Sequence, residues 1–295
     1  MIENLYKLID NKINLSKNEK FTAIIGKNPS KTARSPVLWN KAFENFNLDL
    51  KMISLDVKKE NLKDLFNLLK NNKEFIGGSI TIPYKSDLTT LLGGNISEEA
   101  NKIGSINSLF RKDNDKLYGT NTDGEASLAA FKKKYGEVEN KKIMILGCGG
   151  AGKAVSAFFS KEIKKGDLYL TSKNKNNKAY SEKLENTTWV DWDKKQEFLN
   201  NMDIIINCSS LGFDTQIHIS PIQEEFYKHL KSSVIFYDII YNPPKTKFLE
   251  FAENNNFKTL NGSEMNILQA AISFNYVVEK NIDEIKEAMI KNNKK

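Results

Sequence analysis

The segment Gly78–Lys85, with the sequence GSITIPYK, places a lysine directly behind a short strand pattern. Ile80 and Ile82 alternate with polar residues, and Pro83 ends a strand because it has no N–H to donate to a neighbour. Lys85 is then either a solvated side chain or an ammonium held at a strand end where a reaction needs a proton. The residues of this segment alone leave both interpretations open.

Three further polar clusters interrupt otherwise apolar stretches, at Thr32–Pro36, Ile103–Ser108 and Gly119–Gly124. Asn and Asp beside Gly are ordinary turn residues, so each cluster by itself can be explained by turn formation. The same polar side chains are also suited to capping helices or satisfying strand ends. Their possible role in binding a substrate therefore depends on what they resemble together.

A glycine-rich loop follows a second strand pattern in Lys142–Val155, KIMILGCGGAGKAV. Gly147 permits a tight turn, Gly149 lets the backbone approach a pyrophosphate, and small residues let the helix pack closely on the strand. The free N–H groups at the start of the helix then attract the phosphates. The pattern predicts a dinucleotide-binding domain, in which Cys148 is only a small loop residue.

The next strand favours one nucleotide over the other. NAD sites usually carry Asp or Glu about 20 residues after the loop, to bind the ribose 2′-hydroxyl. Here the strand Leu168–Thr171 continues into Ser172–Lys178, which has no carboxylate but contains Lys173, Lys175 and Lys178. Lysines attract a 2′-phosphate, so we expect NADP. The alternative is a solvated loop in a lysine-rich protein.

These segments lie in an alternation of short apolar runs and amphipathic stretches, which predicts an α/β fold built from βαβ units. The expected strands are Phe21–Gly26, Met52–Val57, Ile76–Ile82, Ile143–Gly147, Asp167–Ser172, Asp203–Asn207 and Val234–Ile239. The expected helices are Pro36–Phe46, Lys59–Lys70, Gly152–Lys161 and Thr246–Asn255, with two more in Ser263–Met289.

We expect a domain boundary near Asn121–Gly124, after a polar hairpin at Phe110–Leu117 and before the nucleotide-binding pattern. The terminal helices in Ser263–Met289 are expected to return to the first domain, which would make that domain discontinuous. Residues Ile2–Ile13 predict a short extra helix, with Ile2, Leu5, Ile9 and Ile13 on one side, whose simplest role is that of a surface cap.

Composition excludes several classes of protein. The 295 residues suffice for one large or two ordinary domains, and 40% hydrophobic with 27% charged residues is typical of a globular chain. Two cysteines and two histidines, without ligand spacing, make a disulfide framework or a zinc site unexpected and favour a reducing cytoplasm. We expect no signal peptide or membrane-spanning helix, because long apolar runs are missing. The net charge of +7 is scattered, which suits an anionic small molecule better than nucleic acid.

Taken together and in this order, the polar clusters strongly resemble the shikimate dehydrogenase (shikimate/quinate dehydrogenase) family, over almost the whole chain from Phe21 onward. The family's HSxSP, NVTxPxK, GAVNT and NTDG motifs resemble Thr32–Pro36, Ser79–Lys85, Gly104–Ser108 and Asn121–Gly124. Its GxGGA, INxTxxG, YDxxYxP and GxxMLxxQ motifs resemble Gly147–Ala151, Ile206–Gly212, Tyr237–Pro243 and Gly262–Gln269. NTDG with the lysine upstream is the specific part of this resemblance.

The resemblance implies two domains. Residues 1–123 and 264–295 would form an α/β substrate domain with a mixed sheet, and residues 124–263 a Rossmann-type doubly wound NADP-binding domain. The implied reaction is the reversible, NADPH-dependent reduction of 3-dehydroshikimate to shikimate in chorismate biosynthesis. We expect a monomer or homodimer with a small-molecule substrate.

By the same resemblance, Lys85 would donate a proton to the developing alkoxide, and Asp123 would orient the ammonium. Ser35 would bind the substrate carboxylate near Tyr241. The expected ligands of the ring hydroxyls are Thr81, Asn107 and Gln269. The expected cofactor-binding residues are Gly147, Gly149, Gly150, Ala151, Ser172, Lys173, Asn174 and Gly262.

The chain departs from the family pattern at Thr32, Ala33 and Ser79, where the family has histidine, serine and asparagine. Ala33 has no hydroxyl for a carboxylate, although Arg34 beside it could offer a bidentate partner. These changes leave open a divergent dehydrogenase for quinate or a similar ring acid. A further alternative is an NADP-binding paralogue without turnover, against which the retained Lys85 and Asp123 argue.

Overall fold

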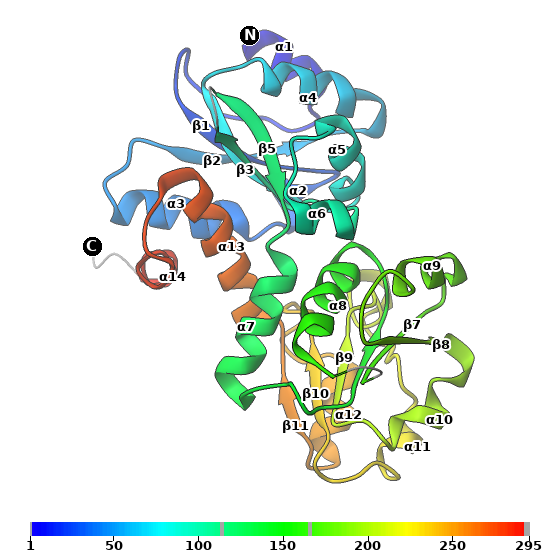
Figure 1. Ribbon diagram of the computed structural model, residues 1–295. Helices are drawn as coiled ribbons and strands as arrows, with labels where there is room; N and C mark the ends of the chain where they lie inside the picture. Colours follow the sequence, from blue (N-terminus) through cyan, green and yellow to red (C-terminus); the bar gives the residue numbers. More distant parts are fainter. Residues whose placement is uncertain (1, 113–114, 165–166, 292–295) are drawn as a thin grey trace. The chain divides into compact units, whose positions relative to one another are not determined.

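A computed structural model describes residues 2–112, 115–164 and 167–291. The chain divides into two compact units, one formed by Met1–Thr122 with Ile267–Lys295 and the other by Asp123–Asn266 (Figure 1). The boundaries predicted from the sequence lie at 123/124 and 263/264. Each unit is built around its own β-sheet, as the alternation of apolar runs and amphipathic stretches predicts.

The first unit holds a mixed sheet with the strand order β2-β1-β3-β4-β5. Its strands are β1 (Phe21–Gly26), β2 (Lys51–Asp56), β3 (Phe75–Ile80), β4 (Ser108–Lys112) and β5 (Lys116–Thr120). Strand β1 pairs in parallel with β2 and β3, whereas β4 runs antiparallel to β3 and β5. Strands β4 and β5 form the predicted hairpin, whose positions 113 and 114 lie outside the described residues.

Two hydrophobic clusters cover the two faces of this sheet. Successive residues of β1 enter opposite clusters, with Ile25 in one and Ile24 in the other, because side chains alternate along a strand. The helices of the unit are α1 (Ile2–Leu8), α2 (Pro29–Thr32), α3 (Ser35–Asn45), α4 (Leu62–Lys70), α5 (Lys85–Leu92), α6 (Glu98–Ile103) and α14 (Ile282–Ile290). A 3₁₀ turn, η1 (Lys59–Asn61), precedes α4 and accounts for the start of the helix predicted at Lys59.

The N-terminal helix differs from its prediction. It ends at Leu8, whereas the sequence pattern predicts a helix to Ile13. The side chain of Leu5 is only 1% exposed and belongs to the same hydrophobic cluster as Phe21 and Leu65. The helix therefore covers the core through Leu5, while Asn4 and Lys7 on its other side are exposed, and its role as a surface cap stays a prediction.

The second unit holds a parallel sheet with the strand order β11-β10-β9-β6-β7-β8. Its strands are β6 (Ile143–Leu146), β7 (Leu168–Ser172), β8 (Thr187–Asp191), β9 (Ile204–Asn207), β10 (Ile235–Asp238) and β11 (Lys258–Leu260). The chain starts in the middle of the sheet at β6, proceeds to one edge at β8 and then returns to β9 beside β6 (Figure 1). This is the doubly wound Rossmann order, in which ligands bind where the strand order reverses.

Helices flank the strands of this sheet. They are α7 (Asp123–Tyr135), α8 (Gly150–Glu162), α9 (Lys178–Ser181), α10 (Gln196–Leu199), α11 (Glu224–Tyr227), α12 (Lys247–Asn254) and α13 (Ser263–Val278), with 3₁₀ turns η2 (Lys175–Asn177), η3 (Trp192–Lys194) and η4 (Asp214–Gln216). Helix α13 continues into the first unit. Thr246, predicted as the first residue of α12, is its N-cap and accepts a hydrogen bond from the backbone of Leu249. No helix in the described parts of the chain is long and apolar enough to cross a membrane.

Candidate active site

Lys85 stands at a rigid junction between β3 and α5. Strand β3 ends at Ile80, two residues before the predicted end, although Thr81 still donates its N–H to β1 at 2.9 Å. Tyr84 is the N-cap of α5, and its buried hydroxyl donates to the carbonyl of Val57 at 2.8 Å. Lys85, the first residue of α5, is half-buried. Its backbone is therefore fixed by the residues before it, rather than lying in a mobile loop.

Asn107 connects β3 to the segment that leads into Asp123. Its backbone carbonyl accepts the N–H of Ile80 at 2.8 Å. Its buried side chain accepts the N–H of Thr122 at 2.8 Å and donates to the hydroxyl of Thr122 at 3.1 Å. The side chain thus holds the loop between β5 and α7, a structural role that stands as the alternative to substrate binding.

Asn121 makes a second connection between the same two polar clusters. Its side-chain amide donates to the carbonyl of Ser105 at 2.9 Å, and both residues are buried. The polar clusters at Ile103–Ser108 and Gly119–Gly124 are therefore held together by asparagine side chains from both sides. Asp123 directly follows this joined pair of loops and is the first residue of α7. The side chain of Asp123 is buried.

Gln269 lies on the stretch of α13 that packs on the sheet of the first unit. Its backbone carbonyl accepts the hydroxyl of Thr122 at 3.1 Å. One turn later, the hydroxyl of Ser273 lies 2.6 Å from that of Ser108 on β4. These bonds bring Asn107, Thr122 and Gln269 together, beside the strand end that carries Thr81.

Ser35 is the first residue of α3, a buried position behind the end of β1. Since β1 and β3 are neighbours in the sheet, the loop after β1 and the loop after β3 leave the same edge of it. Asn40 also fits the family motif. Its side chain donates to the carbonyl of Met52 at 3.1 Å and accepts the N–H of Met52 at 2.7 Å. The remaining predicted site residues, Tyr241 and the cofactor ligands, belong to the second unit.

Two buried hydroxyls near these residues lack partners. Among the described residues, the side-chain oxygens of Ser79 and Ser105 are buried without a hydrogen-bond partner. Leaving a buried hydroxyl unpaired costs about 1–3 kcal/mol, so each is a candidate contact for a polar ligand. Ser79 was singled out from the sequence as a departure from the family, whereas Ser105 was missed because it sits among ordinary turn residues.

The glycine loop of the second unit has the shape that a pyrophosphate needs. A Cβ atom on Gly152 would lie 2.2 Å from the carbonyl oxygen of Gly147, and Gly147 itself has a φ of +109°. Gly149 is the N-cap of α8 and has no side-chain capping bond. The first N–H groups of a helix have no partner within it, and a Cβ on Gly149 would meet nothing within 4 Å. The loop therefore leaves an open approach to free N–H donors, a fit for a dinucleotide phosphate.

The end of β7 carries the residues expected to select the nucleotide. The hydroxyl of Ser172 accepts the backbone N–H of Asn174 at 3.3 Å and the side chain of Asn177 at 3.2 Å. Lys173 is exposed, and its ammonium lies 5.7 Å from the ring centre of Trp192. The turn is thus ordered by its own polar residues, with a cation presented at the end of the second strand.

Comparison with known proteins adds an independent observation. The family model described as "Shikimate dehydrogenase substrate binding domain" matches residues 24–109. A shikimate dehydrogenase (NADP(+)) of Methanococcus maripaludis is 32% identical over 267 residues, covering 88% of this chain and 92% of the relative. The corresponding protein of Methanocaldococcus jannaschii is 32% identical over 283 residues, covering 92% of this chain and 96% of the relative. The chain belongs to the shikimate dehydrogenase family.

A solved structure agrees with this assignment. The crystal structure of a shikimate dehydrogenase in complex with NADP⁺ is similar to this chain with a TM-score of 0.81 and 30% identity. The similarity covers 94% of this chain and 96% of that one. The family and the two-domain α/β fold inferred from the sequence motifs are thereby confirmed.

Gly262, a further predicted cofactor residue of this family member, has a clear packing reason. Its N–H donates to the carbonyl of Ile240 at 3.0 Å, and a Cβ there would lie 2.0 Å from the carbonyl oxygen of Ile239. Only glycine allows this close approach of α13 to the segment behind β10.

A buried carboxyl organises the ends of β9 and β10 in the same unit. Asp238 accepts hydrogen bonds from the side chains of Asn207 and Thr246 and from the backbone of Ile240. Burial raises the pKa of Asp238 to about 7, and these donors only partly oppose the shift. The network fixes the start of α12 and the segment that carries Tyr241, three residues further on.

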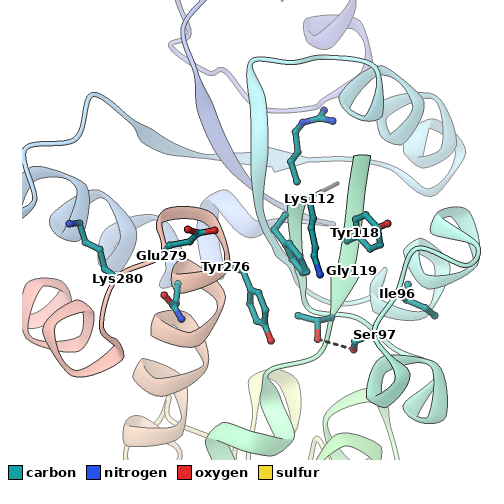
Figure 2. A pocket seen from close by; sticks show the side chains of 12 residues that line it. Ile96, Ser97, Lys112, Tyr118, Gly119, Tyr276, Glu279 and Lys280 are labelled. Atoms are coloured by element: carbon teal, nitrogen blue, oxygen red, sulfur yellow. Dashed lines mark hydrogen bonds between the residues drawn. The ribbon is translucent and has the colours of Figure 1, made fainter. Parts of the chain in front are cut away.

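A pocket of about 720 Å³ in the first unit is separate from the predicted site residues, none of which lines it (Figure 2). It opens over β4 and β5, where the rings of Phe110 and Tyr276 stack at 4.6 Å. Ser97 and Thr120 close one side with a hydrogen bond of 2.9 Å. In the described parts of the chain, no group of three or more His, Cys, Asp and Glu residues is arranged to hold a metal ion.

Proposed function

We propose that this chain is an NADP-dependent shikimate dehydrogenase, which reduces 3-dehydroshikimate reversibly to shikimate in chorismate biosynthesis. The names of its relatives at 32% identity support this activity. The observation that carries the proposal is the junction around Lys85, which stands beside a loop that is held by Asn107 and leads into Asp123.

The proton step rests on Lys85. NADPH, when bound, supplies the hydride for the ring carbonyl. The oxygen of that carbonyl then gains negative charge and needs a proton, which Lys85 donates. Asp123 accepts a hydrogen bond from the ammonium and so orients it, and once the oxygen is protonated Asp123 also accepts one from the new hydroxyl. In the reverse direction Lys85 takes the proton from the shikimate hydroxyl.

Substrate binding falls to the polar residues at the same edge of the sheet. Ser35 binds the carboxylate with Tyr241 nearby, and Thr81 and Gln269 bind ring hydroxyls. Asn107 joins them through its side-chain amide while it also holds Thr122. Residues 1–123 and 264–295 are the substrate domain in this account, and residues 124–263 bind NADP.

The cofactor site uses the glycine loop for the pyrophosphate and the end of β7 for the ribose 2′-phosphate. Gly147, Gly149, Gly150 and Ala151 supply close backbone approach and N–H donors. The second group of cofactor residues is Ser172, Lys173, Asn174 and Gly262. The open approach at Gly149 supports the first assignment.

We place the enzyme in the cytoplasm as a monomer or homodimer that binds small molecules rather than nucleic acid. Cys148 and Cys208 are buried free thiols, which suits a reducing compartment. Burial raises the pKa of Cys148 to about 11, so this loop residue stays a neutral thiol at physiological pH.

Quinate is the second candidate substrate. Ser79 replaces the family's asparagine, and its buried hydroxyl has no partner among the described residues. That hydroxyl could pair with a ring substituent that shikimate lacks. Ala33 likewise changes the segment expected to bind the carboxylate.

One set of assays distinguishes the candidates. The purified protein is mixed with NADP⁺ or NAD⁺ and with shikimate or quinate, and formation of the reduced nucleotide is followed by absorbance. We expect the highest kcat/KM with NADP⁺ and shikimate. A preference for quinate would support the second candidate, and activity with neither acid would overturn both in favour of a non-catalytic paralogue.

A further inference from the structure

Two lysines of the second unit, Lys173 and Lys195, lie over the ring of Trp192, and Lys195 is not among the site residues expected from the sequence. Trp192 follows β8, the strand beside β7, and Asp191 at the end of β8 stands opposite Ser172 in the strand register. The ammonium of Lys195 lies 4.2 Å from the centre of the Trp192 ring, and that of Lys173 lies 5.7 Å from it. Two lysines from neighbouring strand ends therefore share one aromatic ring.

Lys195 is held in place and nearly enclosed. Its side chain donates to the carbonyl of Trp192 at 3.1 Å, and the residue is only 5% exposed. Trp192 in turn packs against the hydrophobic cluster of the second unit. A lysine so deeply buried is rare unless an anion accompanies it.

In the described parts of the chain, neither Lys173 nor Lys195 has a carboxylate oxygen within 4.0 Å. Burial lowers the pKa of Lys195, the charge of Asp193 opposes this shift, and the charge of Lys173 adds a smaller lowering. Asp191, the other carboxylate of this segment, accepts the indole N–H of Trp189 at 3.2 Å. Two cations in this position repel each other, so a bound anion would relieve an existing cost.

We propose that Lys195 is a second cation for the ribose 2′-phosphate of NADP(H) and acts together with Lys173 over the ring of Trp192. The proposal rests on the NADP site of the proposed function and deepens it by adding a residue that sets nucleotide specificity. In doubly wound domains the ribose lies at the end of the second strand, here β7, and Lys195 stands on the segment behind its neighbour β8. Two cations suit the phosphate, because its charge at neutral pH is between −1.5 and −2, about the same as that of phosphorylated side chains.

The test uses adenosine 2′-monophosphate, which carries the phosphate in question but no nicotinamide, with adenosine 5′-monophosphate as the comparison. Binding to the full-length protein is measured by calorimetry for the wild type and for Lys195→Met, Lys173→Met and Lys194→Met. Lys194 is the matched control, because it is an exposed lysine adjacent in sequence. Thermal unfolding checks that each variant is folded.

We expect Lys195→Met and Lys173→Met each to weaken binding of the 2′-phosphate by about tenfold or more, as charged hydrogen bonds usually do. The affinity of these variants for adenosine 5′-monophosphate should change by less than about twofold. The affinity of Lys194→Met for either nucleotide should also stay within about twofold of the wild-type value. Should Lys195→Met fail to fold, Lys195→Arg replaces it as a variant that keeps the charge. Binding is then followed by the fluorescence emission of Trp192. The 2′-phosphate should then alter the tryptophan emission of the wild type but not that of Trp192→Phe.

A folded Lys195→Met that binds the 2′-phosphate as tightly as the wild type would overturn the proposal, and so would a wild type that prefers the 5′-phosphate. These results are separable from failure of the proposed function. If the protein oxidises no ring acid and yet binds the 2′-phosphate through Lys195, only the dehydrogenase assignment falls. If shikimate is oxidised with NADP⁺ regardless of Lys195, only the present inference falls.

Discussion

The side-chain oxygen of Asn107 accepts the backbone N–H of Thr122 at 2.8 Å, directly before the residue that we propose as the partner of Lys85. Both residues are buried. The backbone of Asn107 is meanwhile bound to Ile80 at the end of β3. The position at which the chain enters α7 is therefore set by the side chain of Asn107, whose backbone is bound to the end of β3.

Replacing Asn107 should uncouple these two segments. Asn107→Ala leaves the buried N–H of Thr122 unpaired, so we expect the free energy of unfolding to fall by about 1–3 kcal/mol. The kcat/KM for shikimate should fall as well, whereas the Kd for NADP⁺ should stay unchanged. Urea unfolding, steady-state kinetics and calorimetry measure these three quantities.

Thr122→Val supplies the control for that prediction, because it removes the hydroxyl bonds but keeps the N–H of Thr122. In a double-mutant cycle the two substitutions should be strongly non-additive in stability, since the residues are in direct contact. Additive effects would mean that the hydroxyl of Thr122 adds nothing to the link, which would then depend on its N–H alone.

Replacement of two glycines in the cofactor loop by alanine should have different effects on stability. Gly152→Ala places a Cβ 2.2 Å from a backbone oxygen, so the loop must shift, and we expect a loss of stability of about 1–3 kcal/mol. Gly149 has an extended backbone with φ −76° and open space around it, so Gly149→Ala should unfold like the wild type. Its methyl group would instead occupy the approach of the pyrophosphate.

We therefore expect Gly149→Ala to weaken NADP⁺ binding by about tenfold or more without loss of stability, an effect of roughly 1.4 kcal/mol on binding. Calorimetry with NADP⁺ and thermal unfolding on the same preparations measure both effects. Undiminished NADP⁺ affinity in Gly149→Ala would show that the pyrophosphate does not pass this residue.

Asp238 should make the stability of the second unit depend on pH. Its pKa is about 7 in the folded chain and near 3.8 for a free side chain, so the folded state binds the proton more tightly. Its contribution to stability is then complete below the unfolded pKa and is lost as the pH rises through about 7. At about 1.4 kcal/mol per pKa unit, the loss amounts to at most about 4 kcal/mol.

Asp238→Asn removes this titration, because the amide stays neutral and still offers an oxygen to Ile240. The stability of the variant relative to the wild type should rise by several kcal/mol between about pH 4 and pH 8. Urea unfolding over this range measures the difference, with the exposed Asp64→Asn as the control. Parallel curves for wild type and Asp238→Asn would refute a raised pKa.

Much of the fold could be predicted from the sequence, because the central strands are continuous apolar runs. Strand β6 has the sequence IMIL and β9 has IIIN, and both are buried throughout. The edge strands β8 and β11 were missed, since TTWVD and KTL are short and partly polar. The pattern also places Leu5 on the apolar side of the N-terminal helix, but it does not indicate that the helix ends at Leu8.

Sequence motifs single out the candidate site residues. The roles of Lys85, Asp123 and the glycine loop follow from these motifs and stay predictions. The link from Asn107 to Thr122 could not be predicted, because a side-chain hydrogen bond between two loops depends on how the strands pair. Lys195 was missed for a related reason, since its burial depends on β8 and the turn behind it, neither of which the sequence pattern predicts.

Lys85 carries the proposed proton transfer. Its direct test is the rate of NADPH formation from shikimate and NADP⁺ by the wild type, Lys85→Ala and the exposed control Lys63→Ala. Loss of a general acid–base group should lower kcat by about 10²–10⁴-fold in Lys85→Ala. NADPH affinity, measured on the same samples, should not change, and Lys63→Ala should match the wild type. Near-normal turnover by a folded Lys85→Ala would contradict the account.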